Sequence, residues 1–203
     1  MSHNEIYKYR TIRKPAEGLY REKGSKFIAR IEPVSSEEDC REFLQRIRKE
    51  FHDARHHCYA YRINPEQELF RSNDDGEPSG TAGKPILNQI LSNSLFDVMV
   101  IVVRYFGGVK LGVSGLIRAY KEATNDAISQ ARIVTRHLTR RYSLHFEYPK
   151  MNDVMRVIKE EKIKILEQEM SLSCVIKIEV KKSDLEKIIF RFGNLRDIEL
   201  KSL

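Results

Sequence analysis

The chain has 203 residues, of which 32% are charged and 41% hydrophobic, and it carries a formal net charge of +7. This composition is that of a globular protein with one large or two small domains, and it excludes membrane-spanning proteins because no stretch approaches ~20 consecutive apolar residues. Residues 1–30 lack the apolar core of a secretion signal, and three cysteines without a C-x-x-C pair fit reduced thiols, so we expect a cytoplasmic protein.

Hydrophobic patterning predicts a first domain with the element order β-α-β-β-α-β-α. Ser36 is a good N-cap for the first helix, and Asp39 follows three residues later. Six apolar residues at 98–103 show no alternation, which indicates a strand buried on both faces. The predicted elements are a strand at 25–34, a helix at 36–51, a strand pair at 57–63 and 68–72, a helix from Pro85 to about 94, a strand at 98–103 and a helix at 112–132.

The pattern then restarts in a compact form, with the order β-α-β-β-α-β of a ferredoxin-like domain. The second helix of this half starts with Ser183 as its expected cap. We therefore predict a domain at 1–134, a domain at 139–203 and a linker near 134–139. The elements of the second domain are expected at 141–148, 151–161, 164–169, 173–180, 183–192 and 197–203.

The positive charge is concentrated between the two halves, where residues 132–150 carry five lysines and arginines against one glutamate. Four arginines, which we call the basic belt, surround His137 where we expect a helix end and a domain junction: Arg132, Arg136, Arg140 and Arg141. Such a belt can bind phosphates. The alternative is a solvated helix end, because cations are favourable at a helix C-terminus.

Seven of the ten glycines lie in two segments, and the first of these, at 74–85, is acidic. It presents Asp74, Asp75 and Glu77 and then opens a helix with Lys84 in its first turn. A helix N-terminus can hold an anion, whereas the acids can hold a hard cation such as magnesium or accept hydrogen bonds from a partner. The alternative is that the acids bind backbone N–H groups of the loop and cap the helix.

The second glycine segment, at 104–115, joins a strand to a helix, an arrangement in which α/β proteins bind ligands. It matches neither the P-loop nor the G-x-G-x-x-G spacing. Arg104, Tyr105, Phe106 and Lys110 combine charge with stacking faces, as surfaces that bind single-stranded nucleic acid do. The alternative is that both aromatic rings close the core and the glycines permit tight helix packing.

His52 and His56 are four residues apart, as two zinc ligands on a helix can be, with Asp53 in the place of the expected glutamate. The strand pattern from His57 favours hydrogen-bonded histidines and a buried Cys58 instead. Catalysis by Cys58 with His56 would need a lowered thiol pKa. We assign no metal, cofactor or catalytic residue.

These motifs resemble the IMPACT family. The resemblance rests on residues 75–85, on 104–112 with 115–120, and weakly on His56 with 58–61. It covers about residues 18–130, and the compact second half is similar to the second domain of bacterial members. The family often has Gly-Gly where this chain has Ser114-Gly115.

The resemblance implies an α+β or α/β two-layer fold, with a first domain similar to a ribosomal-protein domain-2-like fold. It implies a second domain similar to the ferredoxin-like C-terminal domain of elongation factor G. Eukaryotic members regulate translation by competing for a large activator of a stress-responsive initiation-factor kinase, through docking that involves an additional N-terminal domain. No established catalytic residues come with the family.

We therefore interpret the chain as a binding protein linked to translation or the stress response, with RNA or a ribosome-associated component as partner. The alternatives are a protein-interaction module and a phosphotransferase-like enzyme, in which Asp75 or Glu77 holds magnesium and Lys110 a phosphate. The predicted binding residues, besides the basic belt, are Asp75, Gly76, Glu77, Pro78, Gly80, Thr81, Gly83, Lys84, Arg104, Tyr105, Phe106, Gly107, Gly108, Lys110, Gly112, Arg118 and His56.

Overall fold

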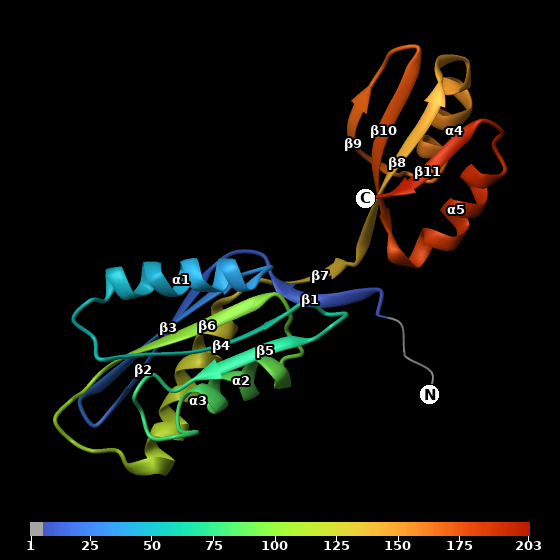
Figure 1. Cartoon of the computed structure of the whole chain (residues 1–203). Coiled ribbons are helices and arrows are strands. Elements are labelled where there is room, and N and C mark those ends of the chain that lie inside the picture. Colours follow the sequence, from blue (N-terminus) through green and yellow to red (C-terminus); the bar gives the residue numbers. More distant parts are fainter. Residues whose placement is uncertain (1–5) are drawn as a thin grey trace. The chain divides into compact units, whose positions relative to one another are not determined.

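The computed structural model of the chain describes residues 6–203 (Figure 1). Residues 1–5 of the predicted first domain lie outside the described residues. The chain divides into two compact units, one spanning Tyr9–Arg136 and the other His137–Leu203 with the segment up to Lys8. Among residues 6–203, none of the helices combines the length and the apolar character that crossing a membrane requires.

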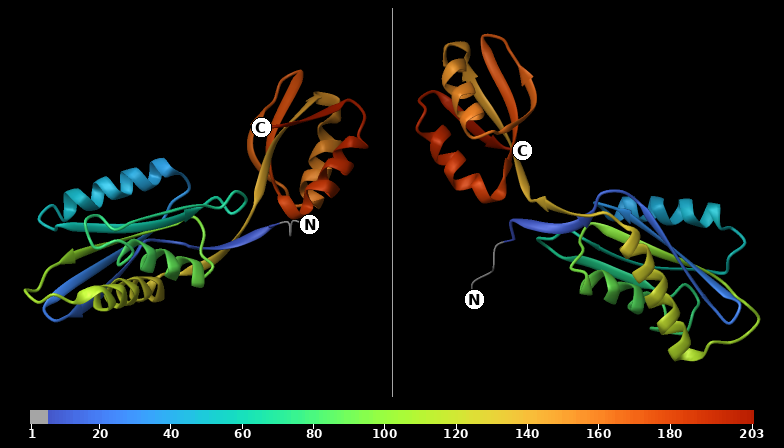
Figure 2. Two further views of the ribbon diagram at one scale, coloured as in Figure 1. Left: turned by 60° about the horizontal axis from the view of Figure 1, so that its bottom comes forward. Right: turned by 180° about the vertical axis from the view of Figure 1, so that it is seen from behind.

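The first unit is built on a five-stranded sheet with strand order β2-β3-β6-β4-β5. Every neighbouring pair in this sheet is antiparallel. Helix α1 covers one face, and α2 and α3 cover the other, as Figures 1 and 2 show. The strands are β2 (Ala16–Glu22), β3 (Ser25–Pro33), β4 (His56–Ile63), β5 (Leu69–Asn73) and β6 (Val98–Tyr105), and the helices are α1 (Glu37–Glu50), α2 (Gly83–Ser92) and α3 (Gly112–Gln130).

Strand β6 lies at the centre of this sheet, and its first seven residues are buried. Met99, Ile101 and Val103 pack into the core under α1. Val98, Val100 and Val102 pack into the core under α2 and α3. The alternation of side chains along a strand sends an apolar residue into each core in turn, which explains the unbroken apolar run in the sequence.

Helix α1 begins where its sequence predicts. Ser36 accepts a hydrogen bond from the Asp39 N–H at 3.1 Å, and the Asp39 carboxylate accepts one from the Ser36 N–H at 3.2 Å. This reciprocal pair is a capping box, which satisfies N–H groups that the first helical turn leaves unpaired. Phe43 and Ile47 then recur at helical spacing on the buried face.

Three strands of this part of the chain were not predicted: β2, β1 (Lys8–Ile12) and β7 (Ile133–His137). β1 and β7 form a two-stranded sheet of their own. The predicted linker at 134–139 contains the boundary between the two units, at Arg136 and His137, and most of it is formed by β7 and the start of β8 (Thr139–Glu147). Helix α3 also ends at Gln130, before the predicted helix end in the basic belt.

The second unit has the predicted ferredoxin-like order, with a four-stranded antiparallel sheet arranged β11-β8-β10-β9. The predicted cap at Ser183 is wrong, because a 3-10 turn occupies Lys182–Asp184 and the Ser183 hydroxyl donates to the Asp184 side chain. A second 3-10 turn lies at Tyr148–Lys150. The remaining elements are α4 (Met151–Glu160), β9 (Lys164–Glu169), β10 (Ser173–Lys181), α5 (Leu185–Gly193) and β11 (Ile198–Ser202).

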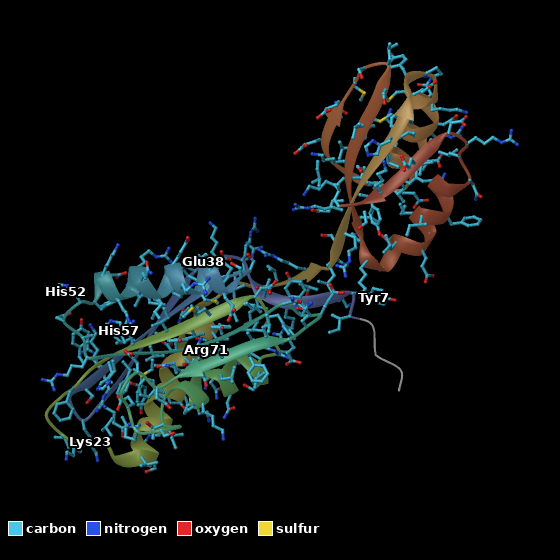
Figure 3. All side chains as sticks on the ribbon, in the orientation of Figure 1. Tyr7, Lys23, Glu38, His52, His57 and Arg71 are labelled. Carbon is cyan, nitrogen blue, oxygen red and sulfur yellow. The ribbon has the colours of Figure 1, made fainter. Side chains whose placement is uncertain are left out.

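Strand directions in the first unit bring both glycine segments to one end of the sheet. β5 and β6 both run antiparallel to β4, so their carboxyl ends lie at the same edge. The amino ends of β3 and β4 lie there too, since Lys26 pairs with Tyr105 and His56 with Arg104. We call this edge the glycine end of the sheet. Figure 3 shows Lys23, His52 and His57 at this end.

Candidate functional site

A buried ion pair joins the two glycine segments. Arg104 Nη1 donates to Glu77 Oε1 at 2.7 Å, and each residue is only 8% exposed. The hydroxyl of Tyr120, on α3, donates to the same carboxylate oxygen at 2.8 Å. Cys58 Sγ lies 3.2 Å from that hydroxyl. The loops after β5 and β6 are thus fixed to each other and to α3 by one polar network.

Cys58 and Tyr120 are the fully buried part of this network, and its geometry decides the role of Cys58. Burial raises the pKa of the Cys58 thiol and of the Tyr120 hydroxyl well above their usual ranges. The Cys58 sulfur lies 2.9 Å from the carbonyl oxygen of Asp74. The thiol is therefore a hydrogen-bonded structural group, because a cysteine nucleophile requires a lowered pKa.

The acidic segment uses its carboxylates within the protein. Asp74 accepts hydrogen bonds from the N–H groups of Gly80, Ala82 and Gly83 at 2.8–3.0 Å. Burial opposes ionisation of this carboxyl, but the three hydrogen bonds prevail and lower its pKa. Asp74 therefore occupies the amino end of α2, where the sequence suggested that a ligand anion could sit. The side chain of Lys84, in that first turn, points into solvent and is exposed.

Asp75 is also engaged, on both of its oxygens. One oxygen accepts from the His57 N–H at 2.7 Å, and the other pairs with Arg48 Nη2 at 2.9 Å. Asp75 and Glu77 were the magnesium ligands of the enzyme alternative, and here both carboxylates are bonded to groups of the protein. Within residues 6–203, no group of three or more His, Cys, Asp or Glu side chains is arranged to hold a metal ion.

The other predicted residues of the acidic segment shape its backbone. Thr81 is buried and donates to the Pro78 carbonyl at 2.7 Å, while Pro78 itself is exposed. Gly76 and Gly80 have positive φ angles. Gly83 lies against the backbone of Asn73, at a distance that leaves no room for a Cβ. The buried residues of this segment support the loop, while Gly76, Pro78 and Lys84 are exposed, and their part in binding stays a prediction.

The basic-aromatic segment differs from the sequence interpretation at Arg104, which is buried rather than free. Tyr105 donates its hydroxyl to Asp53 at 2.7 Å, and this hydrogen bond raises the Tyr105 pKa to about 12. Phe106 is 59% exposed, so its ring does not close the core. Its ring centre lies 5.7 Å from the Arg104 guanidinium carbon, a cation–π distance.

Gly107 is required where two turns meet. A Cβ at this position would lie 1.9 Å from the carbonyl carbon of Gly24, in the β2–β3 turn. The Gly107 N–H also donates to the Ser25 hydroxyl at 3.1 Å. Gly108 and Gly112 have positive φ angles and open space around them. The loop therefore rests on the β2–β3 turn and exposes its outer side.

Several exposed side chains at the glycine end were missed from the sequence. Val113 and Ile117 are exposed and lie four residues apart on α3, next to exposed Val109 on the loop. We call Phe106, Val109, Val113 and Ile117 the apolar face. Helical periodicity could have identified Val113 and Ile117 as exposed, because Leu116 and Tyr120 form the buried stripe on the opposite side of the same helix. Arg118, predicted as a binding residue, forms an ion pair with Glu22.

Three exposed cations surround this region: Lys23 in the β2–β3 turn, Arg55 before β4, and Lys110 in the loop after β6. Within the described part of the chain, none of the three has a side-chain ion pair or hydrogen bond. Among the nearby acids, Asp75 and Glu77 have ion-pair partners, whereas Asp53 is bonded only to the Tyr105 hydroxyl. The glycine end therefore presents three cations that have no carboxylate partner, beside the exposed Asp53 carboxylate.

A cavity of about 380 Å³ opens between the start of β4 and the end of β6. Its lining includes Asp53, Arg55, His56, Arg104, Tyr105 and Phe106. We call it the Arg55 cavity. His56 Nδ1 lies 2.9 Å from the Asp75 carbonyl oxygen. Because a carbonyl only accepts, Nδ1 carries a proton in this contact, and in the neutral ring Nε2 is then an acceptor.

The zinc alternative placed His52 and His56 on one helix. Helix α1 ends at Glu50, and His56 is the first residue of β4, so the two side chains do not share a helix face. His57 is buried, and its Nε2 lies 3.1 Å from the Phe51 carbonyl oxygen. Burial lowers the pKa of His57, so it is held in its neutral form.

Three of the four basic-belt arginines lie on strands, and only Arg132 lies near a helix end. Arg132 follows α3, and Arg136 lies on β7 in the first unit. Arg140 and Arg141 lie on β8 in the second unit, where Arg141 Nε is 3.8 Å from Glu179. The binding of phosphates by this belt stays a prediction.

Comparison with known proteins agrees with these motifs. A family model described as the Impact N-terminal domain matches residues 23–128. The chain is 35% identical to IMPACT family member YvyE of Bacillus subtilis (strain 168), covering 80% of this chain and 75% of that protein. It is 31% identical to IMPACT family member YigZ of Escherichia coli (strain K12), covering 77% and 78%. A crystal structure described as that of a hypothetical protein matches with a TM-score of 0.75 and 25% identity, covering 98% of each chain. The chain belongs to the IMPACT family.

Proposed function

We propose that the chain is a binding protein linked to the regulation of translation or the stress response, which engages RNA at the glycine end of its first sheet. The observation that carries the proposal is the combination of unpaired cations with an exposed ring. Lys23, Arg55 and Lys110 can contact phosphates, and Phe106 offers a face on which a base can stack.

The buried network supports this proposal by fixing the surface before a partner arrives. The Arg104–Glu77 pair and the contact of Gly107 with Gly24 hold the loop after β6 in one position. A loop that is already ordered loses less conformational entropy on binding, so more of the interaction energy appears as affinity. The IMPACT family supports the link to translation, because its eukaryotic members regulate translation.

The test is fluorescence anisotropy of a mixed-sequence single-stranded RNA at two salt concentrations. We expect affinity to fall as salt rises, since phosphate contacts release counterions. The double variant Lys23→Ala/Lys110→Ala should weaken binding and reduce its salt dependence. Lys14→Ala is the matched control, because this exposed lysine precedes β2 and lies at the opposite end of the sheet. Affinity that neither salt nor the double variant changes would refute the proposal.

The apolar face favours a second candidate, a protein-interaction module. Its four exposed apolar side chains lie within twelve residues of each other in the chain, and exposed apolar patches are typical of a protein contact. In that case Val113→Ser/Ile117→Ser would abolish binding of a protein partner, while RNA would not bind to the unmodified chain. RNA binding that survives Val113→Ser/Ile117→Ser but not Lys23→Ala/Lys110→Ala would favour the first proposal.

A further inference from the structure

The Arg55 cavity has the size of a small-molecule site and lies beside the surface proposed to bind RNA. Its volume of about 380 Å³ is within the ~300–1,000 Å³ that is usual for ligand pockets. Its lining offers three kinds of chemistry: cationic groups, hydrogen-bond acceptors and aromatic rings. A ligand that uses all three needs an anion, hydroxyl or N–H donors, and a planar ring.

The cationic groups are Arg55 and Arg104. Arg55 is exposed and has no protein partner among residues 6–203. Arg104 is 92% buried, Glu77 takes its Nη1, and its Nε is without a hydrogen-bond partner. Glu77 offsets the charge of Arg104, and the lining also holds the Asp53 carboxylate, with which Arg55 forms no ion pair, so the Arg55 donors are left for a ligand. Guanidinium groups are suited to phosphate because their N–H donors match its oxygens.

The acceptors are His56 and Asp53. His56 Nε2 has no protein partner in the described chain, and its lone pair can accept a hydrogen bond from a hydroxyl. Asp53 accepts from the Tyr105 hydroxyl, a bond that lowers the Asp53 pKa and keeps the carboxylate ionised. Two acceptors beside two cations do not suit a bare anion such as inorganic phosphate. They do suit the hydroxyl groups of a ribose that carries a phosphate.

The planar ring of such a ligand has a neighbour in Phe106, which lines the cavity and is 59% exposed. Stacking of a base on an aromatic side chain is worth about 1–3 kcal/mol and tolerates any base. We propose that the Arg55 cavity binds a ribonucleoside monophosphate group, with Arg55 and Arg104 on the phosphate, His56 and Asp53 on the ribose hydroxyls, and Phe106 on the base. The inference rests on the proposed function, whose site it shares, and names the group recognised there.

Two sources offer this group, the 5′-phosphorylated end of an RNA and a free mononucleotide. The experiment compares the affinities of AMP, adenosine, inorganic phosphate, and a ten-residue RNA with either a 5′-phosphate or a 5′-hydroxyl, all by isothermal titration calorimetry on the full chain. We expect AMP to bind more tightly than adenosine or phosphate. Arg55→Ala should weaken AMP about tenfold or more, the effect of losing one hydrogen bond to a charged group.

Arg55 is suited to substitution because it is exposed and makes no contact that the fold needs. Arg71→Ala, an exposed arginine on β5 that pairs across the ladder with Tyr61, is the control and should leave AMP binding unchanged. Phe106→Ala should weaken the binding of AMP but not the binding of inorganic phosphate. A circular dichroism spectrum equal to that of the unmodified chain shows that each variant is folded.

Each outcome separates this inference from the proposed function. Preference for the 5′-phosphorylated RNA, lost in Arg55→Ala, supports both and identifies an RNA end as the source. Binding of AMP without binding of either RNA supports the cavity but refutes the proposed function. RNA that binds equally with a 5′-phosphate or a 5′-hydroxyl, together with no binding of AMP, overturns the inference and leaves the proposed function standing.

Discussion

Replacing Glu77 with alanine tests whether the buried network holds the glycine end together. The change leaves the Arg104 guanidinium buried without its counter-charge and removes the acceptor of the Tyr120 hydroxyl. Tyr120 is fully buried and Arg104 is 8% exposed, so water has little access to replace the lost carboxylate. Removing one partner of a buried ion pair costs about 3–5 kcal/mol. We expect Glu77→Ala to destabilise the Tyr9–Arg136 unit by this amount.

The assay is unfolding in urea, monitored by the hydrogen exchange of the β6 amides, which mass spectrometry detects. These amides report on the first unit alone. The control is the double variant Glu77→Leu/Arg104→Met, which removes both charges and fills the space with apolar groups. Such replacements are often neutral, so it should be more stable than Glu77→Ala. A single variant that is as stable as the unmodified chain, or a double variant less stable than the single, would refute this account of the network.

Three further changes follow from the same contacts. Gly107→Ala should destabilise the first unit by about 1–3 kcal/mol because the new Cβ would collide with Gly24. Gly193 has open space around it, so Gly193→Ala should not destabilise the second unit. Thermal unfolding of the two variants tests both expectations. Asp74→Ala should cost about 0.5–2 kcal/mol near neutral pH, as for lost helix caps. Since the folded-state pKa of Asp74 is lowered, its contribution to stability is present above the ordinary pKa of 3.8 and is lost as the pH falls below that value. The unfolding free energies of the variant and the unmodified chain should therefore converge in acid. A difference between them that is constant with pH would contradict this. Burial lowers the His57 pKa, so the folded chain resists a proton that the unfolded chain binds, and stability should fall as pH drops through 6.5; His57→Gln should flatten that slope in urea titrations at several pH values.

Much of the fold could be predicted from the sequence because most elements are strongly patterned. The helix from Ser36 carries its own capping box, and the apolar run at 98–103 is long enough to require two covered faces. The missed strands lack such patterns. β1 and β2 carry exposed charged residues and β2 contains Gly18, while the arginine and histidine of β7 are typical of a helix end. The pairing of β1 with β7, which lie more than 100 residues apart, is not visible in local sequence, whereas β2 pairs with the neighbouring β3.

The place of the candidate site could be predicted from the sequence, but the roles of its individual side chains could not. Glycine density identified both loops, and strand order then brings them to one end. The charges were harder to interpret, because a carboxylate in a glycine-rich loop has the same sequence signal whether it binds a ligand or its own backbone. Asp74 binds the backbone of its own loop, and Glu77 binds the side chains of Arg104 and Tyr120, the second of them 43 residues away. The free cations Lys23 and Arg55 lie in turns that no motif marked.

Mapping of amide chemical shifts by NMR, during titration of the ¹⁵N-labelled chain with 5′-phosphorylated single-stranded RNA, tests the central claim most directly. The account predicts that the largest shifts fall at the glycine end, in residues 23–25, 55–57 and 104–112, and that they shrink as salt is added. Shifts confined to other surfaces of the chain, or no shifts at RNA concentrations that saturate anisotropy, would contradict it.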